Sequence, residues 1–300
     1  MAENIYYVGG DAPCKSLTEM FLSLKDDFSR KTIYVNQGTY DIYREYREAG
    51  MATPPDDITA ADYLERCVFL PPNTSLIGVG EVVLEWAPPK GEITKGEART
   101  WSPLNIRYAC HVENITIHCK YGRYCIHDDS HNGETDRGVT HRYRNVRCIY
   151  DYSEDGMGFN NTIGFGFSQK NQILFENCEL VMRGCPADSP DHSAFYGHGA
   201  SGRAVLAEES PTITVKNCRL LGGEKNGRTI RLQCLNRVPL HIVTLFENCT
   251  VEGGVYLTLY REDALQAFDV TLRSCGAPPV RIDRPEENPY PVKLLPGSSE

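Results

Sequence analysis

The sequence lacks the features that mark a membrane protein, a nucleic-acid binder or a redox protein. No stretch approaches about 18 consecutive apolar residues, which disfavours a membrane span. No run of basic residues occurs in a chain of net charge −9, which disfavours nucleic acid and anionic membranes as partners. No Cys-x-x-Cys pair occurs among the twelve cysteines, which disfavours a thioredoxin-like redox motif.

The N-terminus also lacks a secretion signal. Met1-Ala2-Glu3-Asn4 has neither the cationic nor the apolar segment of a signal peptide. We therefore expect cytoplasmic synthesis without a signal peptide, and a component of a phage or prophage particle fits because such particles leave the cell by lysis. The acidic composition suits glycans, cations or other proteins as partners, and we expect a monomer or a homotrimer.

One short phrase recurs six times, an alternating apolar strand that ends at a cysteine. The phrases are residues 115–119, 143–148, 174–178, 213–218, 245–249 and 270–275. Their cysteines lie 26 to 40 residues apart, a period typical of stacked repeats. Further short strands are predicted at residues 124–127, 163–167, 204–207, 229–233 and 255–259. This pattern predicts an all-β chain that forms a single-stranded right-handed parallel β-helix over residues 31–276.

The six recurring cysteines are predicted to stack inside the β-helix as reduced thiols, because a free thiol packs like a small hydrophobe. Asn177, Asn217 and Asn248 precede three of them and are predicted to lie at a turn, where stacked amides hydrogen-bond from coil to coil. We interpret both residue types as structural, with a metal or redox role as the alternative.

Residues 1–30 are expected to form a strand and a helix that covers the open end of the β-helix. Ser16 and Glu19 form a capping box at the start of this helix. One face of the helix would carry Leu17, Phe21, Leu24 and Phe28. Residues 277–300 are rich in proline and charge and are expected to form an extended tail.

The order of the N-terminal segments resembles the pectate-lyase-like superfamily of right-handed β-helix proteins. The similar features are Gly9-Gly10-Asp11, the following helix, Ile33-Tyr34-Val35 before Gly38-Thr39-Tyr40, and Leu76-Ile77-Gly78. The superfamily includes carbohydrate-active enzymes and phage tail-spike-like proteins, so the resemblance implies a function on polysaccharides. The strand motifs of pectin esterases and the acidic arrangement of calcium-dependent lyases do not occur in recognisable form.

Two acidic segments align with each other, residues 126–130 and 206–210. If Ile126 points inward, strand alternation turns His127 and Asp129 outward, with Glu209 two coils away. Equivalent positions two coils apart are separated by about 9.6 Å, which suits an inverting glycosidase better than a retaining one. We therefore predict Asp129, Glu209 and His127 as catalytic residues. Solvated corners or cation sites are the alternative.

Substrate-binding residues are expected on the same outer face. Arg231 and Gln233 would hold a uronate or sulfate, and Tyr256 and Tyr260 would stack on sugar rings. His198 lies in residues 188–199, which we expect to overhang this face as a loop. The alternative is that these are ordinary exposed side chains.

A metal site is also conceivable from the residue types. Asp128 and Glu208 offer the oxygen ligands that calcium prefers, so calcium is the one cofactor we consider. Zinc held by Asp191, His192 and His198 is a weaker alternative.

These observations predict a protein that binds and cleaves polysaccharide, of glycoside hydrolase or lyase type, through an acidic groove on the β-helix face. The alternatives are a non-catalytic glycan-binding module of phage-tail or adhesin type and a structural β-helix. An enzyme requires two carboxyl groups within about 10 Å in a trough. An adhesin requires a shallow aromatic face.

Overall fold

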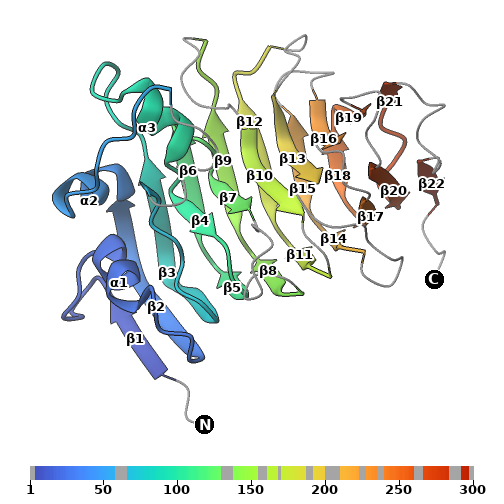
Figure 1. Cartoon of the computed structure of the whole chain (residues 1–300). Coiled ribbons are helices and arrows are strands. Elements are labelled where there is room, and N and C mark those ends of the chain that lie inside the picture. The colour runs from blue at the N-terminus through green and yellow to red at the C-terminus, as the bar shows by residue number, and fades with distance from the viewer. Residues whose placement is uncertain are drawn as a thin grey trace.

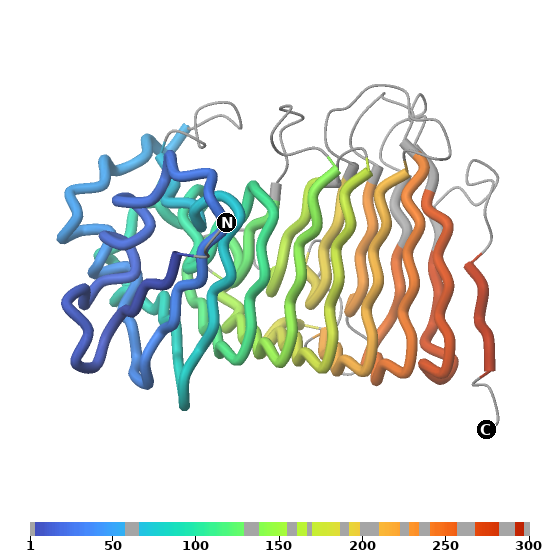
Figure 2. The backbone as a smooth tube through the Cα atoms, turned by 90° about the horizontal axis from the view of Figure 1, so that it is seen from below, coloured from blue at the N-terminus to red at the C-terminus, as the bar shows by residue number. Residues whose placement is uncertain are grey.

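Parallel strands stacked along one axis make up most of the protein (Figures 1 and 2). The computed structural model describes residues 4–57, 66–129, 138–154, 161–167, 170–186, 192–199, 210–222, 228–234, 240–259, 266–283 and 292–296. In this part of the chain, sheet A has 15 strands and sheet B has 7. The predicted fold, a single-stranded right-handed parallel β-helix, is confirmed.

Each coil within residues 110–259 contributes two strands to sheet A and one to sheet B. The first coils contain β1 (Asn4–Val8), β2 (Lys31–Asp41), β3 (Thr74–Trp86) and β4 (Leu104–Ile106). What we call column A1 contains β5 (Cys110–Glu113), β8 (Thr140–Arg144), β11 (Gln172–Glu176), β14 (Thr212–Lys216), β17 (Leu240–Glu247), β20 (Gln266–Arg273) and β22 (Lys293–Leu295). Column A2 contains β6 (Thr116–Lys120), β9 (Arg147–Asp151), β12 (Glu179–Arg183), β15 (Arg219–Gly222) and β18 (Thr250–Glu252). Sheet B continues from β4 with β7 (Ile126–Asp129), β10 (Asn161–Phe167), β13 (Ser193–Gly199), β16 (Arg228–Cys234), β19 (Gly254–Leu259) and β21 (Val280–Asp283).

The turn from column A1 to column A2 passes through one residue with positive φ. These residues are Asn114, Asn145, Asn177, Asn217, Asn248 and Ser274, with φ between 52° and 57°. Asparagine tolerates this left-handed conformation better than other residues with a side chain. Asn145 Nδ2 donates to Asn114 Oδ1 at 3.0 Å, and Asn248 Nδ2 lies 3.4 Å from Asn217 Oδ1. The predicted asparagine turn is therefore confirmed.

The cysteine column holds four of the six predicted members. Cys178, Cys218, Cys249 and Cys275 each follow the turn residue, and the Cys178 N–H donates to Cys218 Sγ at 3.3 Å. Cys119 and Cys148 lie instead within β6 and β9, in different registers. The prediction of one six-membered column is thus wrong. Eleven of the twelve cysteines, among them all six of the recurring phrase, are free thiols.

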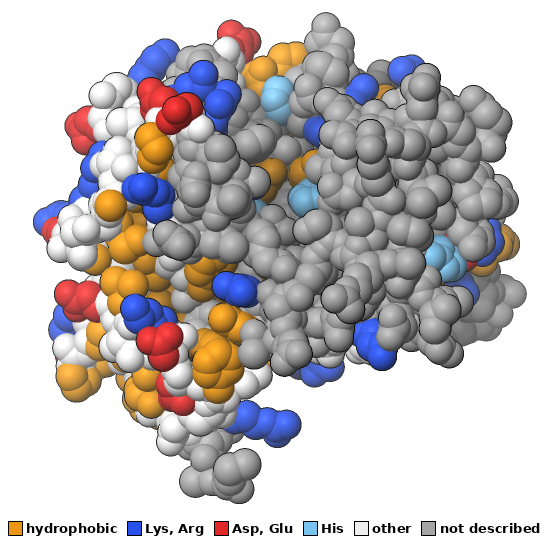
Figure 3. Space-filling model, in the orientation of Figure 1, with side chains coloured by type: hydrophobic (Ala, Val, Ile, Leu, Met, Phe, Trp, Pro, Cys, Tyr) orange, Lys and Arg blue, Asp and Glu red, His pale blue; other side chains and the backbone are white. Residues whose placement is uncertain are grey.

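Helix α1 (Leu17–Leu24) lies at the N-terminal end of the stack (Figure 1). Ser16 Oγ accepts from the Glu19 N–H at 3.2 Å, and it donates to Glu45 Oε2 at 2.8 Å. Glu45 also accepts from the Thr18 N–H at 2.8 Å, so this carboxylate from a second helix completes the helix N-terminus. The helix ends before Phe28, whose side chain is 49% exposed rather than on a buried face. Figure 3 shows hydrophobic side chains on the surface over these N-terminal elements.

Two short helices occur in segments that the sequence pattern leaves as insertions. They are α2 (Ile42–Glu48) and α3 (Lys95–Thr100). Tyr43 and Tyr46 of α2 pack edge-on against Trp86 with ring centroids 5.3 and 5.4 Å away. None of the helices in the described residues has the length and apolar character needed to cross a membrane.

Within residues 277–300, where an extended tail is expected, two strands continue the stack. Strand β21 pairs with β19 in sheet B, and β22 pairs with β20 in sheet A. Lys293 Nζ of β22 lies 2.9 Å from Asp269 Oδ1 of β20.

An outward row of column A1 alternates in charge from coil to coil. Consecutive register partners in this row are Glu113, Arg144, Glu176, Lys216, Glu247 and Arg273. Lys216 Nζ and Arg273 Nη1 each lie 2.9 Å from a Glu247 oxygen. These pairs lower the pKa of Glu247, with the Lys216 contact the largest cause.

Candidate functional site

The side of sheet B that faces away from the β-helix core carries one continuous row, in which every residue except a glycine is polar or aromatic and the first members are buried. Its members, in register from coil to coil, are Asn105, His127, Gly164, Tyr196, Arg231, Tyr256 and Arg281. The alternate residues, such as Ile126, Ile163 and Phe195, are buried in the core. Because side chains alternate along a strand, the first set shares the opposite, outer face. We call this row the sheet B face.

A glycine in the middle of the sheet B face makes room for an aromatic ring. A Cβ added to Gly164 would lie 2.5 Å from Tyr124 Cε2, so a larger residue would displace the Tyr124 ring. That ring lies 5.5 Å from the His127 ring and 6.4 Å from the Tyr196 ring, measured between centroids. Gly164 thus allows three rings, two from the coil before it and one from the coil after it, to gather.

A hydrogen-bonded cluster occupies the next coils. Arg231 Cζ lies 4.5 Å from the Tyr196 ring centroid, and Arg231 Nη2 donates to Gln233 Oε1 at 2.9 Å. Tyr196 Oη donates to the same oxygen at 3.0 Å. All three side chains are at most 7% exposed. Contact between a cation and a ring face, together with shared hydrogen bonds, holds the guanidinium in one orientation.

Tyr256 lies between two further cations. Arg228 Cζ is 4.6 Å and Arg281 Cζ is 5.7 Å from the Tyr256 ring centroid. Tyr256 is half-buried, and it is the register neighbour of Arg231. The described part of the sheet B face is therefore aromatic and cationic over β13, β16, β19 and β21.

The structure places five of the predicted site residues on this side of sheet B. His127, Arg231 and Tyr256 belong to the row itself. His198 and Gln233 are register partners two residues further along β13 and β16, so they share the same side of the sheet. Asp129 ends β7 and is in register with Gly166, the partner of His198. Glu208, Glu209 and Tyr260 lie outside the described residues.

One predicted strand assignment is wrong, and the predicted carboxylate pair depended on it. The sheet B strand between β10 and β16 is β13 (Ser193–Gly199), in a segment that was expected to overhang as a loop. Residues 204–207, which were predicted to form this strand, lie outside the described residues. The register equivalent of Asp129 two coils away is consequently His198 and not Glu209. Tyr196 was not predicted as a site residue, because it belongs to the row only if β13 is a strand of sheet B.

Asp128, predicted as a calcium ligand, points into the β-helix rather than toward the groove. It is fully buried, and its Oδ2 lies 2.5 Å from His141 Nδ1 and 2.8 Å from Tyr143 Oη. Burial, and then the charge of Asp128, raise the pKa of Tyr143 well above its usual value. Over the described ranges no group of three or more His, Cys, Asp or Glu side chains is placed to hold a metal ion. The calcium site stays a prediction.

Comparisons with known proteins identify similar structures but no sequence relatives. No family model matches the chain, and no curated protein matches it. A pectin methylesterase from carrot is similar over 98% of this chain and 89% of its own, with 9% identity and a TM-score of 0.41. Pectin methylesterase from Aspergillus niger, in two deglycosylated forms, is similar over 100% of this chain and 88% of its own, with 10% identity and TM-scores of 0.31 and 0.30.

Proposed function

We propose that this parallel β-helix binds and cleaves an acidic polysaccharide that lies along the sheet B face. The observation that carries the proposal is the register row that places Tyr196, Arg231 and Tyr256 on consecutive coils. Coils are spaced by about 4.8 Å, so an extended polymer crossing them passes the positions of the row one after another. Tyr256 and Arg281 are the more accessible of these side chains, and the buried Tyr196 and Arg231 lie beneath the start of the same strip.

The chemistry of this row suits an acidic sugar. A guanidinium binds carboxylate and sulfate oxygens through two parallel hydrogen bonds. Tyrosine faces pack on the apolar C–H surfaces of sugar rings. Arg228 and Arg281 beside Tyr256 add positive charge to the same strip. A neutral polymer would leave these cations without a partner on the ligand.

We assign cleavage to Asp129 and His127 of β7, with Glu209, which lies outside the described residues and is not the register equivalent of Asp129, as the second carboxylate. In hydrolysis, one carboxylic acid protonates the leaving glycosidic oxygen while a second carboxylate takes a proton from the attacking water. In elimination, a base takes the proton next to the uronate carboxyl group, and a double bond forms as the glycosidic C–O bond breaks. His127 can act in either reaction because its charge changes near neutral pH.

A glycan panel tests this proposal on the full-length protein. Polygalacturonate, pectin and a sulfated glycan would be compared with a neutral glycan, with new reducing ends counted for both reactions and absorbance of unsaturated ends for elimination only. We expect the acidic polymers to be preferred. Arg231→Gln should raise KM at least about tenfold, and Asp129→Asn or Glu209→Gln should lower kcat at least about 100-fold.

The control is Arg144→Gln, which removes the same charge from column A1. It should leave KM unchanged, because Arg144 is outside the sheet B face and is paired with Glu113 at 3.9 Å and Glu176 at 3.7 Å. Full activity in both carboxylate variants would remove the catalytic assignment. Equal activity on the neutral glycan would contradict the acidic substrate.

The second candidate is a non-catalytic glycan-binding module of adhesin or phage-tail type. The observation that favours it is that the row is aromatic and cationic over its last four coils, which suits binding. The register position that contains Asp129 at one end has its next aspartate, Asp283, at the other end, so these two carboxylates are far apart along the axis. Such a module would retard an acidic polysaccharide in affinity electrophoresis without releasing reducing or unsaturated ends. Tyr256→Ala should then weaken retardation, while Tyr34→Ala on β2 should not.

A further inference from the structure

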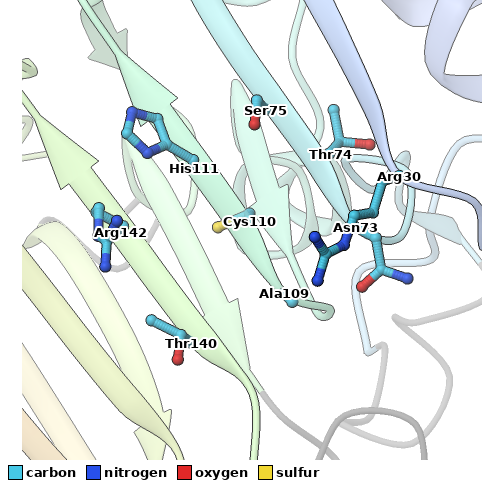
Figure 4. Close-up of a pocket in the computed structure, with 9 residues that line it drawn as sticks. All are labelled: Arg30, Asn73, Thr74, Ser75, Ala109, Cys110, His111, Thr140 and Arg142. Carbon is cyan, nitrogen blue, oxygen red and sulfur yellow. The ribbon is translucent and has the colours of Figure 1, made fainter. Parts of the chain in front are cut away.

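A hollow lies on sheet A, at the start of column A1. Its volume is about 450 Å³, and it shares no residue with the sheet B face. Its lining consists of Arg30, Asn73, Thr74, Ser75, Ala109, Cys110, His111, Thr140 and Arg142 (Figure 4). No prediction from the sequence included this surface.

The hollow arises because short side chains lie between two long ones. Ser75, His111 and Arg142 are outward register partners on β3, β5 and β8. Ala109 and Arg30 each directly precede a strand of this stack. Figure 4 shows Ala109 between Arg30 on one side and Arg142 on the other. Alanine and serine do not fill the space between the two guanidinium groups.

The two arginines differ from their neighbours in having no carboxylate partner. Both side chains are exposed, and neither forms an ion pair with any residue that the structure describes. Arg144, two residues along the same strand, pairs with Glu113 and Glu176. Within the lining, the His111 side chain has a carboxylate partner, with Glu113 Oε2 2.9 Å from His111 Nε2. Two unpaired guanidinium groups at one hollow are unexpected in a chain of net charge −9.

Neutral donors line the hollow together with the two cations. Ser75 and Thr140 contribute hydroxyl groups to the lining. Asn73 Nδ2 donates one proton to the Phe28 carbonyl at 2.8 Å and keeps a second for a ligand. Cationic groups beside hydroxyl and amide donors make a surface complementary to an anion that accepts several hydrogen bonds.

We infer that this hollow binds an oxyanion group, a carboxylate, sulfate or phosphate, of an anionic ligand. Arg30 and Arg142 supply the charge, and Ser75, Thr140 and Asn73 supply neutral hydrogen bonds. The inference does not depend on the sheet B face, because none of these residues belongs to it. An acidic saccharide and a free inorganic anion present the same group, so the experiment has to separate them.

Calorimetric titration of the full-length protein at low ionic strength tests the inference. The probes are an oligogalacturonate, a sulfated oligosaccharide, inorganic sulfate and inorganic phosphate. Arg30→Gln and Arg142→Gln should each weaken binding of the preferred probe about tenfold. Arg144→Gln, which changes the net charge equally on the same strand, should weaken it less than about twofold.

A substitution that keeps the charge gives an independent control. Ala109→Phe fills the hollow without removing a cation, and it should abolish binding while the melting temperature confirms that the variant is folded. Arg231→Gln should leave this binding intact, which separates the hollow from the sheet B face. Tighter binding of the saccharides than of the inorganic ions would identify a saccharide ligand, and equal binding would identify a free anion.

Three results would overturn the inference. The first is that none of the four probes binds. The second is equal weakening by Arg144→Gln and Arg142→Gln, which would mean diffuse attraction to surface charge. The third is unchanged binding in Ala109→Phe.

Discussion

A buried carboxylate organises polar side chains inside the coils next to the hollow. Asp128 Oδ2 lies within hydrogen-bond distance of both His141 and Tyr143, and all three residues are fully buried. The Tyr143 ring also stacks on Phe175 with centroids 4.6 Å apart. Tyr143 therefore contributes both a charged hydrogen bond and ring packing, and a single-atom change separates the two.

Tyr143→Phe keeps the ring and removes the hydroxyl. We expect the free energy of unfolding to fall by about 1.5–3 kcal/mol, the range for a hydrogen bond to a charged group. Urea denaturation would measure it, with Tyr7→Phe as the control, since the Tyr7 side chain is 51% exposed. An equal effect of the two substitutions would show that Asp128 does not depend on this donor.

His118 links folding stability to pH. Its Nε2 lies 2.7 Å from Asp151 Oδ2, and this bond is the largest cause both of the raised pKa of His118 and of the lowered pKa of Asp151. The histidine contribution is complete below its unfolded pKa of about 6.5 and is lost as pH rises through the folded pKa. The aspartate contribution is present above about pH 3.9 and is lost as pH falls through its folded pKa.

The pair should therefore stabilise the fold most between about pH 4 and pH 6.5. His118→Asn should lower the free energy of unfolding by at most about 1 kcal/mol at about pH 5.5, because the pair is partly exposed. The loss should be smaller at about pH 8.5, because the histidine is then mostly neutral in both states. Urea denaturation at both pH values would measure this. A difference independent of pH would show that His118 acts without its charge.

At the scale of the elements, the asparagine turn joins columns A1 and A2. Asn145 has φ of 52° and donates its side-chain amide to Asn114. Asn145→Ala should cost about 1–2 kcal/mol because alanine is strained in this conformation, and Asn145→Gly should cost less because glycine is not. Thermal unfolding compares the two variants. If glycine proved as costly as alanine, the side-chain bond and not the backbone would be the important term.

The strands of column A1 were predictable from the sequence because their apolar residues alternate around an inward face. The turn was also predictable, since asparagine suits its backbone conformation. The prediction that Cys148 belongs to the cysteine column was wrong because cysteine packs well at more than one inward position. Residue type alone therefore does not determine the register. The sheet B strand was predicted at residues 204–207 instead of Ser193–Gly199 because both segments contain a short apolar run and the coil is long enough for either to form the strand.

The site was less predictable than the fold for a related reason. Alternation on β7 and β16 correctly placed His127 and Arg231 on one face. Tyr196 joins them only because β13 begins at Ser193, and nothing in the local sequence distinguishes that start from a loop. The hollow beside Ala109 required the register of three coils at once, which no single segment contains.

At the scale of the whole molecule, each coil touches only its neighbours, so stability should vary along the axis. Strands β10 and β13 have partners on both sides, whereas β1 pairs only with β2 and β22 only with β20 in the described residues. We expect amides of β1 and β22 to exchange with deuterium at least about tenfold faster than those of β10 and β13. Mass spectrometry of peptic peptides would measure this, and uniform exchange would contradict it by indicating a single cooperative unit.

The alternating row of column A1 has a consequence for how the chain winds. If the coil with Arg144 were skipped during folding, Glu113 would meet Glu176, and if the coil with Glu176 were skipped, Arg144 would meet Lys216. Either omission would place two like charges side by side at the point where the coil is missing. The alternation of acidic and basic residues along the sequence thus disfavours any winding in which a coil is omitted.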